Sequence, residues 1–148
     1  MFLNPSYGEV MTDTAKLRGM ATASYWAADW AAAKAWYTEL IGFEPYFLRD
    51  GYAEWRLGDY QDELGLIDSR YRPPGYAEAR PAGAVTYWHV DDVEATLKRL
   101  VSLGATELDP PTERGEPGSG WMTAIAADPF GNVLGLMHSP HYLDLLNR

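Results

Sequence analysis

The pattern of apolar and polar residues begins with a predicted strand, a helix and three further strands. A run of small and aromatic residues from 20 to 28 is typical of a buried strand. A helix is expected next, because Asp29 can cap its N-terminus and Gly42 lies where a left-handed residue ends a helix. Its apolar positions follow helical spacing: Ala33, Trp36, Tyr37 and Leu40. Strands follow at 46–49, 52–57 and 63–67, separated by hairpin-type turns at Asp50-Gly51 and Gly58-Asp59.

The same order starts again after a connector rich in Pro and Gly, which favours an extended path. A strand is expected at 84–90, followed by a helix that Asp91 or Asp92 caps, with Glu94 placed for a capping box and Gly104 at the end. Its apolar face is predicted to hold Val93, Leu97, Leu100 and Val101. Further strands are expected at about 105–108, 121–126 and 132–138. The Pro- and Gly-rich segment 109–120 is interpreted as an irregular loop and a candidate lid.

The two halves also match residue by residue. The helix caps Asp29 and Asp92 are 63 positions apart, whereas the segments 64–69 and 134–139 match at an offset of 70. Such a period predicts a tandem repeat, with the extra residues placed in the 109–120 loop. The expected organisation is a leader arm (1–18), a first module (19–69), a linker (70–83), a second module (84–140) and a C-terminal tail (141–148).

Composition narrows the classes of function. The chain has 21 acidic and 12 basic residues, a net charge of −9, which makes nucleic acid an unfavourable partner. Cysteine is absent, so disulfides, thiolate metal sites and a cysteine nucleophile are excluded. Membrane insertion is not expected, because no apolar run reaches spanning length, and the first residues lack a secretory pattern, so a cytoplasmic protein is expected. The aromatic content of 14% suits a core and a pocket for flat ligands.

Two βαβββ units over residues 20–140 resemble the vicinal oxygen chelate superfamily, the glyoxalase, bleomycin-resistance and extradiol-dioxygenase group. The most specific matching segments are Ala28-Asp29 followed by 35–43, and Asp128-Pro129-Phe130-Gly131-Asn132 before the last strand. The resemblance implies an α+β fold in which the two modules form an open, funnel-shaped mixed β-sheet. The helices are then expected outside and the cleft inside. It also implies a homodimer.

Metal-dependent members of that family place a His in the first strand of a module and a Glu in its last strand. Counted from the helix caps and from the Leu-Gly-Leu segments, these positions fall on Thr22, Val85, Gly65 and Gly135. None of these residues ligates a metal, and a shift by one position brings in no ligand either. We therefore expect neither a metal nor another cofactor. A metal-dependent glyoxalase or dioxygenase stays open only if the register is misread.

Strand alternation separates residues that face the cleft from residues under the helices. In strand 52–57 either Trp55 or the pair Glu54 and Arg56 faces the cleft, and the sequence does not choose between them. Glycine at 65 and 135 either widens the cavity or marks a crowded sheet. The predicted ligand-binding residues are Thr22, Ser24, Trp26, Trp55, Gly65, Ile67, Val85, Tyr87, His89, Val133, Gly135 and Met137.

His89 is the main candidate for a chemical role, because an imidazole exchanges protons near neutral pH. The leading hypothesis is a metal-free protein that binds a hydrophobic or aromatic small molecule, as in sequestration or drug resistance. The alternative is a metal-independent isomerase, lyase or cyclase that uses His89 and Tyr87 as catalytic acid and base. A vestigial pocket on a dimerisation module is a third interpretation. His138 and His141 are expected in a surface turn.

Overall fold

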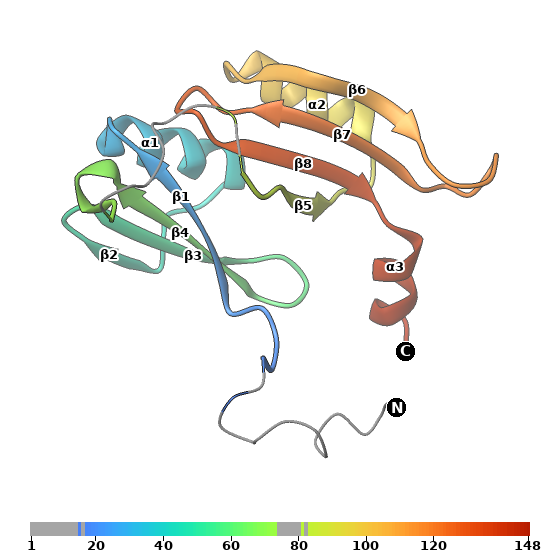
Figure 1. The fold of residues 1–148 in the computed structure, drawn as a ribbon, viewed down its shortest axis with the longest axis horizontal. Helices are drawn as coiled ribbons and strands as arrows, with labels where there is room; N and C mark the ends of the chain where they lie inside the picture. Colours follow the sequence, from blue (N-terminus) through green and yellow to red (C-terminus); the bar gives the residue numbers. More distant parts are fainter. Residues whose placement is uncertain (1–14, 16, 74–80, 82) are drawn as a thin grey trace.

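Two four-stranded sheets, one from each half of the chain, form the framework of the computed structural model (Figure 1). The structure describes residues 15, 17–73, 81 and 83–148, so most of the expected leader arm and linker lie outside the described residues. The first module contains β1 (Thr22–Ala27), α1 (Trp30–Ile41), β2 (Phe47–Arg49), β3 (Tyr52–Leu57), β4 (Asp62–Asp68) and a 3-10 turn (Ser69–Tyr71). The second contains β5 (Thr86–His89), α2 (Val93–Ser102), β6 (Thr106–Glu113), β7 (Met122–Ala127), β8 (Val133–His138) and α3 (Pro140–Leu146).

The two sheets repeat one topology. Their strand orders are β1-β4-β3-β2 and β5-β8-β7-β6, and in each module the first strand runs parallel to the last. Both sheets are therefore mixed and open, and the predicted α+β architecture is confirmed. No helix in the described part of the chain is long and apolar enough to cross a membrane.

Local chemistry explains where the two main helices begin and end. The Asp29 carboxylate accepts the Ala32 N–H at 3.1 Å, and Gly42 ends α1 with a left-handed φ of 100°. Asp92, not Asp91, caps α2 by accepting the Ala95 N–H at 3.0 Å. Glu94 is then one position too early for a capping box, so that expectation is wrong.

Two other predictions, for Val101 and for the segment 109–120, are wrong because of where these residues lie in the fold. Val101 is 46% exposed, because Val93, Leu97 and Leu100 already form the buried stripe of α2. The segment 109–113 belongs to β6, although it contains two prolines. Proline lacks an N–H, which an edge strand tolerates, and the β6–β7 register shifts on both sides of Asp109. The predicted loop is therefore a strand followed by a hairpin turn, and this hairpin extends the far end of the second sheet (Figure 1).

One hydrophobic core serves both modules, with α1 against the first sheet and α2 against the second (Figure 1). Its largest fully buried side chains are Trp55, Tyr37, Leu66 and Leu100. The Trp36 indole N–H also donates to the Leu103 carbonyl at 2.6 Å, which ties α1 to the end of α2.

A buried aspartate strengthens the joint between the modules. Asp128 is 5% exposed, and its Oδ1 accepts the N–H groups of Phe130 and Asn132, both at 2.8 Å. Its Oδ2 accepts the Asn132 amide at 2.8 Å and the Tyr37 hydroxyl at 2.5 Å. The Asn132 side chain in turn bonds the backbone N–H and carbonyl of Trp26 at 3.2 and 2.9 Å. The turn before β8 thus holds both α1 and β1, so the sequence motif at 128–132 is a structural clamp.

Candidate functional site

Most of the residues predicted to face the cleft lie on the face of each sheet opposite its helix. In the first sheet Ser24 lies beside Gly65 and Trp26 beside Ile67. In the second, Tyr87 lies beside Gly135 and His89 beside Met137. Leucines at the alternate positions, 64 and 66 or 134 and 136, are buried on the helical side. The sheets therefore present two open faces, and Thr22, Val85 and Val133 share the parity of these sets.

The prediction that Trp55 binds ligand is wrong. Trp55 is 0% exposed on the helical side of β3, and its indole N–H donates to the Phe43 carbonyl at 3.0 Å. Because neighbouring strand residues point to opposite faces, Glu54 and Arg56 take the open face instead. Trp55 is a core residue and not a ligand-binding one.

The paired glycines do not widen the cavity. A Cβ at Gly65 would lie 2.9 Å from the Ser24 hydroxyl oxygen and 3.1 Å from the Tyr52 hydroxyl oxygen. A Cβ at Gly135 would lie 2.5 Å from a Tyr87 ring carbon. Tyrosines therefore cover both glycines, and the alternative interpretation of a crowded sheet is the correct one.

These positions also do not fit the divalent metal of metal-dependent relatives. Thr22 donates its hydroxyl to the Glu63 carbonyl at 3.1 Å, and tyrosine side chains fill the space at Gly65 and Gly135. Among the residues that the structure describes, no group of three or more His, Asp or Glu side chains is placed to hold a metal ion.

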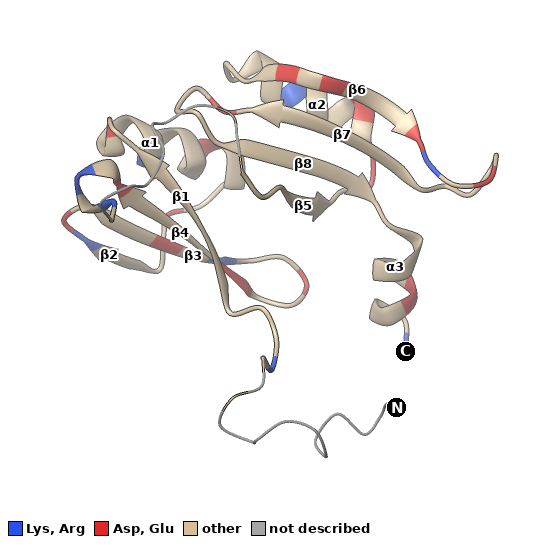
Figure 2. Ribbon diagram, viewed as in Figure 1, with Lys and Arg blue, Asp and Glu red and all other residues tan. Residues whose placement is uncertain are grey.

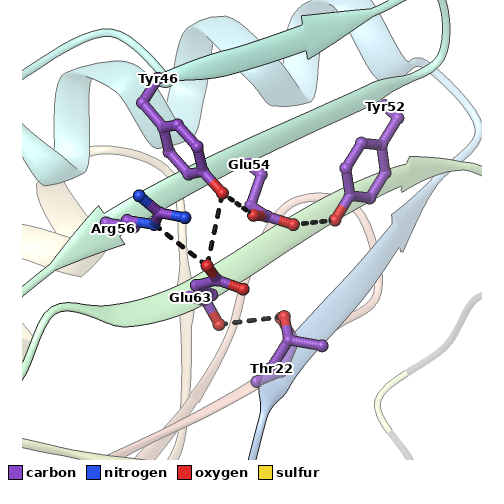
Figure 3. Close-up of polar contacts among 7 residues, drawn as sticks. Thr22, Tyr46, Tyr52, Glu54, Arg56 and Glu63 are labelled. Carbon is purple, nitrogen blue, oxygen red and sulfur yellow. Dashed lines mark hydrogen bonds and ion pairs between the residues drawn. The ribbon is translucent and has the colours of Figure 1, made fainter.

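A carboxylate–phenol cluster occupies the open face of the first sheet (Figure 3). The hydroxyls of Tyr46 and Tyr52 donate to the two oxygens of Glu54. Arg56 pairs with Glu63 at 3.0 Å and lies 4.2 Å over the Tyr46 ring. The hydrogen bond to Glu54 raises the pKa of Tyr46 to about 12, and burial followed by the same carboxylate raises the pKa of Tyr52. The two phenols lower the pKa of Glu54, so at neutral pH it is a saturated carboxylate and a poor base.

Two adjoining cavities lie between the modules. One has a volume of about 240 Å³ and an apolar wall that includes Leu40 of α1, Leu64 of β4 and Leu100 of α2. The other, of about 360 Å³, lies beside α3. Its wall brings together three predicted site residues, Tyr87, His89 and Met137, with side chains that the sequence did not assign to the site: Leu57, Asp59, Asp62, Trp88, Ser139, His141, Tyr142 and Leu145. Leu57, Trp88 and His89 line both cavities.

His89 is held in one orientation within this wall. Its side chain is only 10% exposed, and its ring stacks on Tyr142 at 4.5 Å with an interplanar angle of 6°. Nδ1 accepts the Ser139 N–H at 3.1 Å, so the neutral ring carries its proton on Nε2. Nε2 is buried and has no hydrogen-bond partner among the described residues, and the Asp91 carboxylate is too distant at 3.7 Å. The wall therefore contains a buried donor that no group in the described part of the chain satisfies.

The sequence missed the part of the site that α3 supplies, because residues 141–148 were expected to form a tail. The signal was present, since Ser139 and Pro140 make a standard helix start, and the Ser139 hydroxyl accepts the Tyr142 N–H at 3.1 Å. His138 bonds the Val90 carbonyl through Nδ1 at 3.3 Å, and His141 is exposed on α3.

The fold and the site together define a class of protein: a tandem repeat of βαβββ modules with open sheet faces and cavities between the modules. The family model for the Glyoxalase/Bleomycin resistance protein/Dioxygenase superfamily matches residues 19–136. The chain belongs to this superfamily.

Solved structures share the fold at low sequence identity. A glyoxalase-related enzyme from Fulvimarina pelagi is 21% identical, with 84% of this chain and 90% of that chain covered and a TM-score of 0.67. A glyoxalase/bleomycin resistance protein from Catenulispora acidiphila is 24% identical over 80% and 96% of the two chains, with a TM-score of 0.57. UcmS2 is 25% identical over 84% and 100%, with a TM-score of 0.60. The search of curated proteins gives no significant match.

Proposed function

We propose that this member of the superfamily binds a planar, largely apolar small molecule between its modules and does so without a metal ion. Its role is then sequestration or resistance by binding and not turnover. The observation that supports this most is His89, a nine-tenths buried side chain that lines both cavities and keeps an unsatisfied Nε2–H. A buried donor without a partner is costly, and a ligand that accepts its hydrogen bond recovers that cost.

The residues that line the two cavities suit a mostly apolar ligand that carries one hydrogen-bond acceptor for His89. Trp88, Tyr87 and Met137 offer flat or polarizable surfaces, and leucines make up half of the residues that line the smaller cavity. The tautomer of His89 favours binding over base catalysis, because Ser139 occupies the lone pair of Nδ1. The neutral ring can donate a proton at Nε2, but it has no free lone pair with which to accept one.

A matched pair of probes tests this proposal. Fluorene and 9-fluorenone have nearly the same planar shape, but only fluorenone carries a carbonyl that accepts a hydrogen bond. We expect both to bind the native protein, with fluorenone the tighter ligand. His89→Phe keeps a ring against Tyr142 and removes the donor, so fluorenone should lose about tenfold in affinity while fluorene changes little. Isothermal titration calorimetry measures both dissociation constants.

His138→Phe is the matched control, because its ring lies 5.2 Å from His89 but is not among the described residues that line either cavity. It should leave the preference for fluorenone intact. If neither probe binds the native protein, the binding proposal fails. The second part of the proposal, that the ligand binds without a metal ion, is tested by native mass spectrometry of protein purified without chelators or a metal-affinity tag. One divalent metal per chain would refute metal-free binding, whereas a retained organic adduct would support it.

A further inference from the structure

Tyr142 makes every contact that a bound aromatic molecule would need. Its ring stacks face to face on His89 at 4.5 Å, and the ring of Tyr60 meets it edge-on at 5.4 Å and 78°. At the polar end, the Tyr142 hydroxyl donates to the Asp59 carboxylate at 2.8 Å. A flat face, an edge and a hydrogen-bond acceptor together define the position of one hydroxylated ring.

The helix that carries this ring is weakly attached. α3 spans Pro140–Leu146 and has no buried residue, whereas α1 and α2 each bury at least two side chains in the core. Leu145 and Leu146 are 43% and 40% exposed. Figure 1 shows α3 at the C-terminal end of the chain, below β5 and β8. Little apolar burial therefore opposes its displacement, and the contacts of Tyr142 are a main part of what holds it.

We propose that the face of His89 and the carboxylate of Asp59 form a subsite for a neutral or cationic planar aromatic hydroxyl compound, which Tyr142 fills in the absence of ligand. This inference deepens the proposed function and rests on it. The ligand takes the place of the Tyr142 ring, its hydroxyl donates to Asp59, and α3 moves aside. A site that is open in only a fraction of molecules binds with an affinity reduced by that fraction.

The acidic residues around the subsite determine which class of aromatic ligand it can bind. Asp59 and Asp62 line the adjoining cavity, and no Lys or Arg is among its described lining residues. Figure 2 shows acidic positions on both the β3–β4 turn and α3. An aromatic carboxylate would therefore meet like charge at the end where a phenol finds an acceptor, so phenols are favoured and aromatic acids are excluded.

The test empties the subsite by Tyr142→Ala and measures the binding of 2-naphthol by isothermal titration calorimetry. We expect 2-naphthol to bind about tenfold more tightly than to the native protein, because no protein ring has to leave. The probe 2-methoxynaphthalene lacks the hydroxyl donor and should gain less. The matched control is Leu146→Ala, an exposed position on the same helix, which should leave both affinities unchanged. Adding Asp59→Ala to Tyr142→Ala should remove the preference for 2-naphthol.

The outcomes separate this inference from the function on which it rests. If fluorene and fluorenone bind as proposed but Tyr142→Ala gains no affinity for 2-naphthol, the subsite is wrong and the binding function stands. An equal gain for both naphthalene probes would refute the role of Asp59. If no aromatic probe binds the native protein or the variant, both proposals fall. In Tyr142→Ala, where the native stacking partner of His89 is gone, a ring-current shift of the His89 imidazole protons on addition of 2-naphthol locates the bound probe on that ring.

Discussion

The hydrogen bonds of Asp128 between the modules allow us to predict how much stability is lost when the Tyr37 hydroxyl is removed. Tyr37 is 1% exposed, and its hydroxyl donates to Asp128 at 2.5 Å. Tyr37→Phe removes this bond but keeps the ring, which stacks on Tyr25 at 5.6 Å and meets Trp36 edge-on at 4.8 Å. The carboxylate retains the three other donors at 128–132. The expected cost is therefore that of one buried hydrogen bond to a charged acceptor.

Such a bond contributes about 1.5–3 kcal/mol, and we expect Tyr37→Phe to lower the free energy of unfolding by about 2 kcal/mol. For a chain of this length that loss corresponds to a fall in Tm of roughly 4–8 °C. Urea unfolding followed by tryptophan fluorescence and by circular dichroism measures the loss and checks that both signals change together. Tyr71→Phe is the control, because Tyr71 is 54% exposed and should change stability by less than about 0.5 kcal/mol.

A second variant tests whether the clamp acts as a unit. Asn132→Ala removes the other donor to Asp128 Oδ2 and the two bonds to the Trp26 backbone. Since Tyr37 and Asn132 share one oxygen, the double variant should lose more stability than the two single losses added together. The reasoning is refuted if Tyr37→Phe is as stable as the native protein, or if the two losses simply add.

Two further predictions concern the open faces of the sheets. Gly135→Ala should cost about 1–3 kcal/mol in urea unfolding, because its Cβ would lie 2.5 Å from the Tyr87 ring, while Gly65→Ala should cost less, since its closest contact at 2.9 Å is a hydroxyl that can rotate. Equal costs would contradict this account. Glu54→Ala should move the pKa of Tyr46 from about 12 toward its ordinary value of 10, as followed by NMR of ¹³C-labelled tyrosine. Because the folded pKa is the higher one, the stabilisation is complete below pH 10 and is lost as the pH rises through about 12, and an unchanged titration would show that Glu54 is not the cause.

The sequence predicted the elements that local chemistry determines. Capping residues at 29 and 92, left-handed glycine at 42 and the repeated Leu-Gly-Leu segments gave the order of helices and strands. What it missed depends on neighbours that are distant along the chain. The prolines at 110 and 111 lie in a strand because β6 is an edge, which becomes known only when the sheet is assembled.

The candidate site shows the same limit. Alternation gave the parity of His89 with Tyr87 and of Gly65 with Ser24, because the period of a strand is local. It did not give the tyrosines that cover the glycines, nor the stacking of Tyr142 on His89 across 53 positions of the chain. Those contacts depend on how α3 and the neighbouring strands pack, which no spacing in the sequence specifies.

The open faces of the two modules differ in their polar groups, and the proposed function depends on this difference. Residues that face a helix must be apolar in both halves, so leucine at 64 and 66 recurs at 134 and 136. The open faces carry no such requirement, and the position of Trp26 in the first module corresponds to His89 in the second. On the first face both oxygens of Glu54 already accept hydrogen bonds from tyrosine hydroxyls, whereas on the second face His89 retains a buried donor. In the proposed function a ligand completes a hydrogen bond of His89 on the second face, whereas at Glu54 on the first face it would have to break one. His89 is therefore the residue we expect to supply the polar contact in the cleft between the modules.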